Sequence, residues 1–334
     1  MSKQKTVDHD WTLPEAIEQL ADQADFTSAT PLAQAGQIAM ARHVRKLYNH
    51  LPGALNGDDP HDIHQSRVAT RRLRASLQAT SAAYDPDVVQ GLSKRLRTLA
   101  RVLGAVRDRD VLLMRLRKDA EGLDDAGHLQ AAIERLTQER TAAHADLIRE
   151  LGRKRTTRLQ RDLQDFLLTP PDELHDDDGE LPLLVRHYAG SAIWREYEAV
   201  QRFESVIASA SSEQLHDLRI ACKHMRYTLE LFEPALGEDA AAVIKQVTKM
   251  QEQLGDIHDA DVALEYLGEL PASDRASENG ATDQMETVPL TGIDHYRATR
   301  IAERDALRAD AESVWRSMTN VTQRRKLARL LADM

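Results

Sequence analysis

Apolar residues recur at intervals of three and four positions along most of this chain, which is the pattern of helices that bury one face in a core. One clear series is Leu215, Leu218, Cys222, Met225 and Leu229. Aromatic residues make up only 4% of the sequence, while Ala, Leu, Arg, Asp, Glu and Gln dominate it. This composition favours helices and gives few strand signals. The sequence therefore predicts an all-α fold.

Turn and capping residues divide this pattern into successive helices. A short helix is expected over 13–20. In the first part of the chain, longer helices are then predicted over about 31–51, 60–84, from 86 onward, and 127–168. In the second part, one helix is predicted over about 183–209 and the next ends at about 231. A third is predicted over about 238–267, and the last begins at about 291.

Basic residues occupy the same four offsets in two separate segments. The two sets are His64, Arg67, Arg71 and Arg74, and His216, Arg219, Lys223 and Arg226. Offsets of 0, 3, 7 and 10 place four donors on one helix face, along about 15 Å of axis. In both segments this face lies about 100° round from the apolar one. We therefore expect two basic stripes, a first and a second stripe, that each border the core.

Two further matching segments follow the stripes at nearly the same distance. Residues 103–111 and 254–262 share the pattern Leu-Gly-x-x-x-Asp-x-Asp-Val. The stripes are 152 residues apart and these segments are 151 apart, while five of fourteen and five of ten positions are identical. Two blocks with a common period indicate an internal duplication of one helical domain.

The length of 334 residues is sufficient for about two domains, and the duplication predicts two halves. No run of about 18 apolar residues occurs, which argues against membrane spans and secretion. The single cysteine, Cys222, excludes an internal disulfide and suits a reducing compartment. Because Cys222 lies on an apolar face, we expect a buried and inert thiol.

The net charge is −10, which taken alone would disfavour an anion-binding function. However, residues 1–30, 171–180 and 269–292 carry −4, −6 and −4, so that the rest of the chain is at +4. A bound anion responds to charge within a Debye length of about 8–10 Å. The net charge therefore does not exclude a local anion-binding surface.

Two stripes that each begin with histidine favour a binding surface over simple solvation of a helix face. If the halves pack with pseudo-two-fold symmetry, the stripes can face each other across one groove. Guanidinium groups match phosphate oxygens, and the near absence of aromatic residues among them favours phosphates without bases to stack. A flexible linear polyanion therefore fits better than duplex DNA. We interpret Arg42, His43, Arg45 and Lys46, by contrast, as a solvated helix face.

Further basic residues follow each stripe. Lys94, Arg97 and Arg101 continue the spacing of three and four in the first half, and Lys245 and Lys249 follow the second stripe. Thr248 and Glu252 stand where the first half has Arg97 and Arg101. The two halves are therefore not expected to bind equally.

The carboxylate pairs Asp108/Asp110 and Asp259/Asp261 allow two interpretations. They could orient the stripe arginines by accepting hydrogen bonds, which is the role we favour for Asp108 and Asp259. Alternatively, they could bind divalent ions with His61, His64 or His216, as in an HD-type phosphohydrolase. The His-Asp dipeptide at 61–62 becomes Glu-Gln at 213–214, so the metal set is not repeated. No Gly-x-Ser-x-Gly motif, P-loop or Glu-x-Glu-x-Lys signature is present.

The paired stripes and the Leu-Gly-x-x-x-Asp-x-Asp-Val segments resemble the CHAD family, the conserved histidine α-helical domain. The resemblance covers residues 28–332, with a first repeat over 28–170, an acidic linker over 171–181 and a second repeat over 182–332. Residues 1–27 would then be an acidic extension. It implies two four-helix bundles with pseudo-two-fold symmetry and a basic central cavity.

The resemblance also implies a function, namely binding of inorganic polyphosphate without catalysis. We would then expect a bacterial or archaeal cytoplasmic protein on polyphosphate granules, with other granule proteins as partners. Neither a cofactor nor a metal nor a membrane is expected, and nucleic acid would be only a weak competitor. The motif assigns the contacts to His64, Arg67, Arg71, Arg74, His216, Arg219, Lys223 and Arg226, flanked by Lys94, Arg97, Arg101 and Lys245. Arg72 and Lys249, which lie in the same basic runs, complete the predicted set.

Overall fold

The computed structural model describes residues 11–121, 127–173, 183–268 and 292–334. Within these ranges the regular elements are helices, apart from one isolated β-bridge between Pro31 and Leu184. The predicted all-α class is therefore confirmed. The pseudo-two-fold relation and the central cavity stay predictions.

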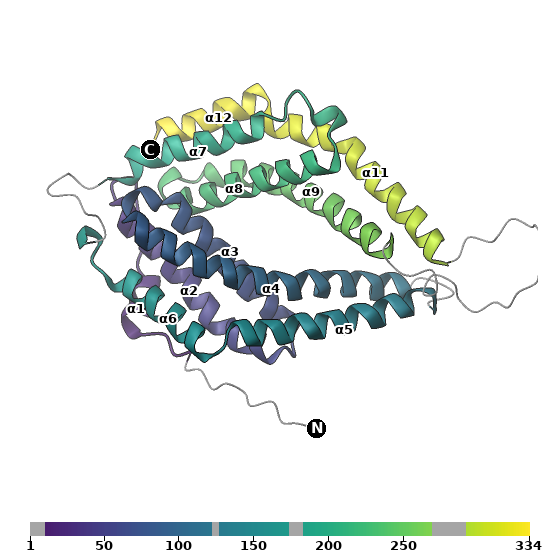
Figure 1. Cartoon of the computed structure of the whole chain (residues 1–334). Coiled ribbons are helices and arrows are strands. Elements are labelled where there is room, and N and C mark those ends of the chain that lie inside the picture. The colour runs from purple at the N-terminus through teal and green to yellow at the C-terminus, as the bar shows by residue number, and fades with distance from the viewer. Residues whose placement is uncertain (1–10, 122–126, 174–182, 269–291) are drawn as a thin grey trace, which may run out of the picture.

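The helices of the first half pack mainly on their neighbours along the chain. They are α1 (Glu15–Ala21), α2 (Leu32–Asn56), α3 (Pro60–Ala79), α4 (Pro86–Glu121), α5 (Gly127–Glu150) and α6 (Arg153–Leu168). Helix α2 packs against α3, α3 against α4, and α4 against α5, while α6 contacts both α2 and α4. These are the purple, blue and teal helices in the lower part of Figure 1.

The second half repeats this order of packing. Its helices are α7 (Val185–Gln201), α8 (Ser212–Leu236), α9 (Ala240–Gly268), α11 (Gly292–Thr319) and α12 (Val321–Ala332). Helix α8 packs between α7 and α9, α9 packs against α11, and α12 contacts α7 and α9. The halves meet where α3 contacts α8, as the centre of Figure 1 shows.

Both stripe helices begin at a residue whose side chain caps the helix. Asp59 accepts a hydrogen bond from the His61 amide at 2.7 Å, and Pro60 occupies the first position of α3. Ser211 accepts one from the Gln214 amide at 3.2 Å. Such caps satisfy free amides at the helix start and contribute about 1 kcal/mol each.

Several predicted helix boundaries were wrong. Helix α2 continues through Pro52 and ends at Gly57, whose φ of 78° a glycine adopts without strain. The helix predicted over 127–168 is interrupted at Gly152, where the Thr156 hydroxyl donates to the Leu151 carbonyl at 2.6 Å. The predicted final helix is interrupted at Asn320, which caps α12. These local contacts outweigh a periodicity that continues across each break.

Two more predicted boundaries extended too far. The helix predicted to reach residue 84 ends at Ala79, because a 3₁₀ turn over Ser81–Ala83 brings Tyr84 inward. The Tyr84 hydroxyl then donates to the Ala33 carbonyl at 2.8 Å. Helix α7 likewise ends at Gln201 and not at 209, where only a short 3₁₀ helix, Ile207–Ser209, follows.

The acidic N-terminal segment is packed against the first half over its described residues. Ile17, Ala21 and Phe26 are buried in the main core. Arg42 donates to the Asp25 carboxylate at 2.7 Å, and Arg45 pairs with Glu18 and Asp22. The sequence had suggested that the basic residues of α2 form a solvated face. This was wrong, because α1 and the loop after it neutralise two of them.

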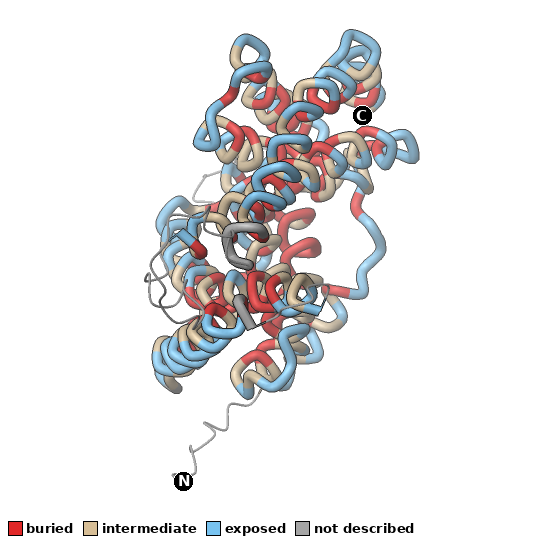
Figure 2. Tube along the Cα trace, turned by 90° about the vertical axis from the view of Figure 1, so that its right-hand side faces the viewer, coloured by how far each residue is buried: buried red, intermediate tan, exposed pale blue. Residues whose placement is uncertain are grey.

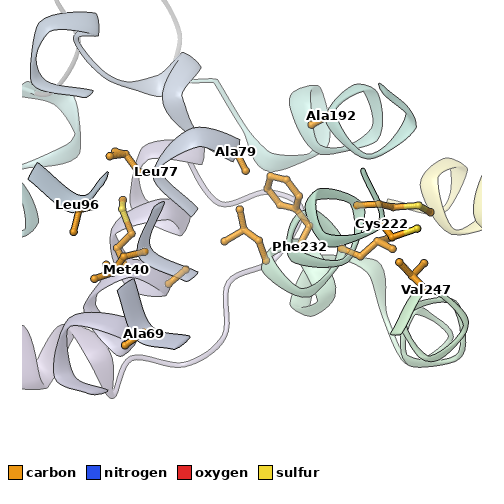
Figure 3. Close-up of a cluster of buried hydrophobic side chains, with 14 of the residues drawn as sticks. Met40, Ala69, Leu77, Ala79, Leu96, Ala192, Cys222, Phe232 and Val247 are labelled. Carbon is orange, nitrogen blue, oxygen red and sulfur yellow. The ribbon is translucent and has the colours of Figure 1, made fainter. Parts of the chain in front are cut away.

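One main hydrophobic core extends through both halves. Figure 3 shows Met40, Leu77 and Leu96 of the first half, and Cys222 and Phe232 of the second, in the same cluster. The buried residues line the inward sides of the helices in Figure 2. Burial raises the pKa of the Cys222 thiol to about 12, and its side chain is fully buried, so the predicted buried thiol is confirmed.

A second hydrophobic cluster joins the halves at the C-terminal ends of α4 and α9 and the N-terminal ends of α5 and α11. It contains Leu116 and Leu129 of the first half and Leu267 and Tyr296 of the second. The Tyr296 hydroxyl donates to the Asp119 carboxylate at 2.7 Å. The halves therefore contact each other both at the α3–α8 pair and at these helix ends.

Most of the predicted linker at 171–181, and the loop at 271–289, lie outside the described residues. Residues Pro171–Glu173 form a 3₁₀ turn. Among the helices that the structure describes, none is both long enough and apolar enough to cross a bilayer.

Candidate functional site

The first stripe lies on α3, beside the seam of residues that α3 buries. Ile63 and Leu73 are fully buried, His64, Arg67 and Arg71 are partly buried, and Arg74 is exposed. The predicted offset between basic and apolar faces is thus present. Because the charges border the core, their solvation is reduced.

The second stripe lies on α8, opposite the first. Burial and the charges of Arg71, Arg219, Arg67 and Arg74 lower the pKa of Lys223 to about 8. Three of those arginines belong to α3, so the two stripes converge on the same region of the molecule. We call Arg67, Arg71, Arg74, Arg219 and Lys223 the central cluster.

An aromatic ring lies under two arginines of the stripes. The guanidinium carbons of Arg71 and Arg226 lie 5.3 and 5.2 Å from the centre of the Tyr227 ring. These distances are typical of cation–π contacts. Tyr227 is itself buried, and the two arginines, one from each half, hold its ring. The ring therefore orients the arginines and is not free to stack on a base.

An ion pair crosses between the halves at one end of the stripes. Arg72 of α3 lies 3.1 Å from Glu230 of α8, and Arg226 lies 3.4 Å from the other oxygen of the same carboxylate. Both residues belong to the predicted phosphate-binding set. Glu230 therefore neutralises Arg72 and Arg226 in part, which makes both less available to a ligand.

Arg107 and His258, which were not among the predicted site residues, also border this region. Burial, Arg107 and Arg71 lower the pKa of His64, while burial and Arg219 lower the pKa of His258. The rings of His216 and His258 have centres 5.1 Å apart. Arg107 and His258 occupy equivalent positions of the two Leu-Gly segments. Both residues can carry a positive charge, and their matching positions could have identified them from the sequence.

The two carboxylates predicted to orient arginines differ in what they contact. Asp108 accepts a hydrogen bond from Arg67 at 3.2 Å, which is the contact expected for that role. For Asp259, burial raises the pKa, and the charges of His258 and Arg219 lower it in part. Asp259 thus lies near the second stripe, but no direct hydrogen bond to a stripe arginine is present among the described residues.

The remaining carboxylates of the alternative metal site also face basic side chains. Asp110 is buried and lies 3.0 Å from Arg140, and Asp261 lies 3.4 Å from Arg304. Asp62 lies 2.8 Å from the His50 ring nitrogen. In the part of the chain that the structure describes, no three His, Cys, Asp or Glu side chains gather as metal ligands. These carboxylates therefore act locally as partners of basic residues.

The flanking basic residues of the two halves are placed differently. Lys94, Arg97 and Arg101 are exposed on α4. Burial lowers the pKa of Arg74, and the nearby charge of Arg97 lowers it further. Lys245 and Lys249 are exposed on α9. The structure thus connects the central cluster to the flank of the first half.

The comparison with protein families decides what this arrangement is. A family model described as the CHAD domain matches residues 38–268. The chain belongs to the CHAD domain family. The match covers α3, α4, α8 and α9, the helices that carry the predicted site.

The CHAD domain of this chain also has curated relatives. Two uncharacterized proteins of Mycobacterium tuberculosis, MT2285 and Rv2226, are each 27% identical over 223 residues. The alignments cover 64% of this chain and 41% of each relative. The chain thus spans about two fifths of the length of these relatives.

Two solved structures share the fold. A crystal structure of the CHAD domain from the plant Ricinus communis superposes with a TM-score of 0.69 at 23% identity, over 90% of this chain and 96% of that one. PptA from Streptomyces chartreusis superposes with a TM-score of 0.55 at 14% identity, over 91% and 100%. At these identities the similarity concerns the fold alone.

Proposed function

We propose that this CHAD domain binds inorganic polyphosphate at the central cluster and does not catalyse its breakdown. One observation carries the proposal. Lys223 is partly buried beside arginines of both halves, and burial together with these charges lowers its pKa to about 8. Crowding and burying positive charge costs free energy, and a bound polyanion offsets that cost.

The surroundings of the cluster favour phosphate over nucleic acid. Tyr227 is covered by Arg71 and Arg226 and therefore offers no face to a base. Proteins that bind single-stranded nucleic acid commonly use free aromatic rings for stacking. A linear phosphate polymer needs only cations and hydrogen-bond donors at intervals, as on the two stripes. The proposal also places the domain on polyphosphate granules.

The absence of catalysis is part of the proposal, and two features of the residues support it. Cys222 is buried, and burial raises the pKa of its thiol to about 12, so it does not act as a nucleophile. Asp108 and Asp110, which a metal-dependent phosphohydrolase would use, are engaged by Arg67 and Arg140. We therefore assign these carboxylates to holding arginines.

A mobility-shift titration of long-chain polyphosphate across a salt series tests the binding. We expect the affinity to fall steeply as salt rises, because each contacted phosphate releases counterions. Single-stranded DNA, added at an equal concentration of phosphate, should compete weakly. Equal competition would overturn the assignment to polyphosphate in favour of a general polyanion scaffold.

A parallel incubation with Mg²⁺ or Mn²⁺ tests the absence of catalysis. The chain length of the polyphosphate, followed on a gel, should stay constant. Shortening that disappears in an Asp108→Asn, Asp259→Asn variant would show a metal-dependent phosphohydrolase. Shortening that persists in this variant would also contradict the non-catalytic proposal, and would direct the search to other residues.

A further inference from the structure

An exposed basic surface covers the first turns of α6, beyond the predicted site. Lys154, Arg155 and Arg158 are exposed there. Arg155 pairs with Glu150, whereas Lys154 and Arg158 have no carboxylate partner among the described residues. Two open hollows lie on this surface, and Lys154 lines both. Neither the stripes nor the Leu-Gly segments account for these cations.

This surface is connected to the central cluster through α4. Arg74 of the cluster lies near Arg97 of α4, and Arg101 follows one turn later. Arg101 lies 3.9 Å from a carboxylate oxygen of Glu150, and Arg155 pairs with the same oxygen. A single carboxylate oxygen therefore lies between a guanidinium group of α4 and one of α6. The basic residues thus form a continuous series from α3 over α4 to α6.

We propose that Lys154, Arg155 and Arg158 form a second phosphate-binding segment, the α6 track, for polyphosphate that extends beyond the central cluster. This inference rests on the proposed function. A chain that just fills the cluster has no phosphates left to reach α6. A longer chain leaves the cluster past Arg97 and Arg101 and places further phosphates on the track. The α6 track therefore makes the domain selective for long chains.

The distribution of acidic residues defines where the track ends. Asp165 of α6 lines a pocket together with Asp85, Asp87 and Glu173, while Asp162, which also lines it, pairs with Arg95 at 2.8 Å. Repulsion from these carboxylates prevents a polyanion from continuing along α6. On α9, Thr248 and Glu252 occupy the positions that match Arg97 and Arg101, so the basic series of α4 is not repeated there. The chain is therefore directed to the first half only.

The test is to remove the three cations of the track and to measure binding of short and long polyphosphate. The variant is Lys154→Ala, Arg155→Ala and Arg158→Ala in the full chain. The short chain should span about 15 Å, the length of one stripe. The matched control is Arg324→Ala, Arg325→Ala and Arg329→Ala, which removes three exposed cations from α12, on the opposite side in Figure 1. Thermal unfolding checks that both variants are folded.

For the track variant, we expect long-chain binding to weaken about tenfold and its log–log salt slope to decrease by about two, from three lost contacts. Short-chain binding should change less than about twofold, and the control should bind both lengths like the original protein. Equal losses for both lengths, or an equal loss in the α12 control, would overturn the α6 track. The proposed function fails separately, if the unaltered protein binds neither length.

Discussion

The two halves of this CHAD domain carry similar stripes but different flanks. His, Arg, a third basic residue and Arg recur at the same offsets on α3 and α8, and these stripes meet. Beyond them, Arg97 and Arg101 on α4 correspond to Thr248 and Glu252 on α9. Under the proposed function, both halves contribute to the common site, whereas only the first half extends it.

The largest effect is expected where the halves converge. Replacing Arg67 and Arg219 by Ala, one from each stripe, should weaken polyphosphate binding by at least about a hundredfold, since each of the two charge-assisted contacts contributes roughly 1.5–3 kcal/mol. The matched control replaces Arg42 and Arg45, whose guanidinium groups are engaged by Asp25 and Asp22. Mobility-shift titrations in which both double variants lose affinity equally would remove the stripes from the site.

Exchanging the flanks should change affinity in opposite directions. Arg97→Thr with Arg101→Glu gives the first half the residues of the second, and binding should weaken about tenfold. Thr248→Arg with Glu252→Arg makes the reverse exchange, and binding should strengthen. All four side chains lie on exposed or partly exposed positions, so stability should change little. Isothermal titration of both variants measures the two shifts, and shifts of the same sign would contradict an asymmetric site.

The pH dependence tests the contribution of the second stripe. Burial and the neighbouring arginines lower the pKa of Lys223 to about 8, and a bound polyanion should raise it again. Binding therefore takes up a proton above pH 8, and affinity should fall about fivefold from pH 7 to pH 9. Lys223→Arg keeps its charge over this range and should remove most of this decrease. Titrations that fall equally in both proteins would place Lys223 outside the contact.

The smallest effect concerns the α6 track and separates stability from binding. The first turn of α6 contains Lys154 and no acidic residue, although a helix start favours negative charge. Lys154→Glu should therefore stabilise the fold by about 0.3–1 kcal/mol while it weakens long-chain binding. Denaturant unfolding and mobility shift, measured on the same preparation, report the two effects. A variant that is destabilised would contradict the argument for a charged helix start.

Much of the secondary structure could be predicted, because it depends on neighbours along the chain. Asp59 and Pro60 mark the start of α3, and the spacing of Leu215, Leu218 and Cys222 correctly indicates the buried side of α8. The breaks at Gly152 and Asn320 were missed, since the apolar periodicity continues across both. Such breaks depend on local hydrogen bonds that a periodic pattern does not report.

The composition of the site could be predicted only in part. The stripes were identified because a pair of equally spaced basic series is visible in the sequence. The pairing of Arg72 with Glu230, and of Arg42 with Asp25, joins residues that are distant in sequence, and no spacing indicates it. His43, which was expected in solvent, is half-buried near Arg72, and desolvation together with this charge lowers its pKa to about 3.

The sequence by itself determined which face of each stripe helix is basic and which is apolar, because the helical period relates the positions of side chains within one helix. Only the tertiary structure decided that the two basic faces meet, which arginines a carboxylate neutralises, and which remain exposed toward α6. These properties depend on the packing of α3 against α8 and of α4 against α6. Charge interactions act through space over several ångströms, so they follow from that packing and not from distance along the chain.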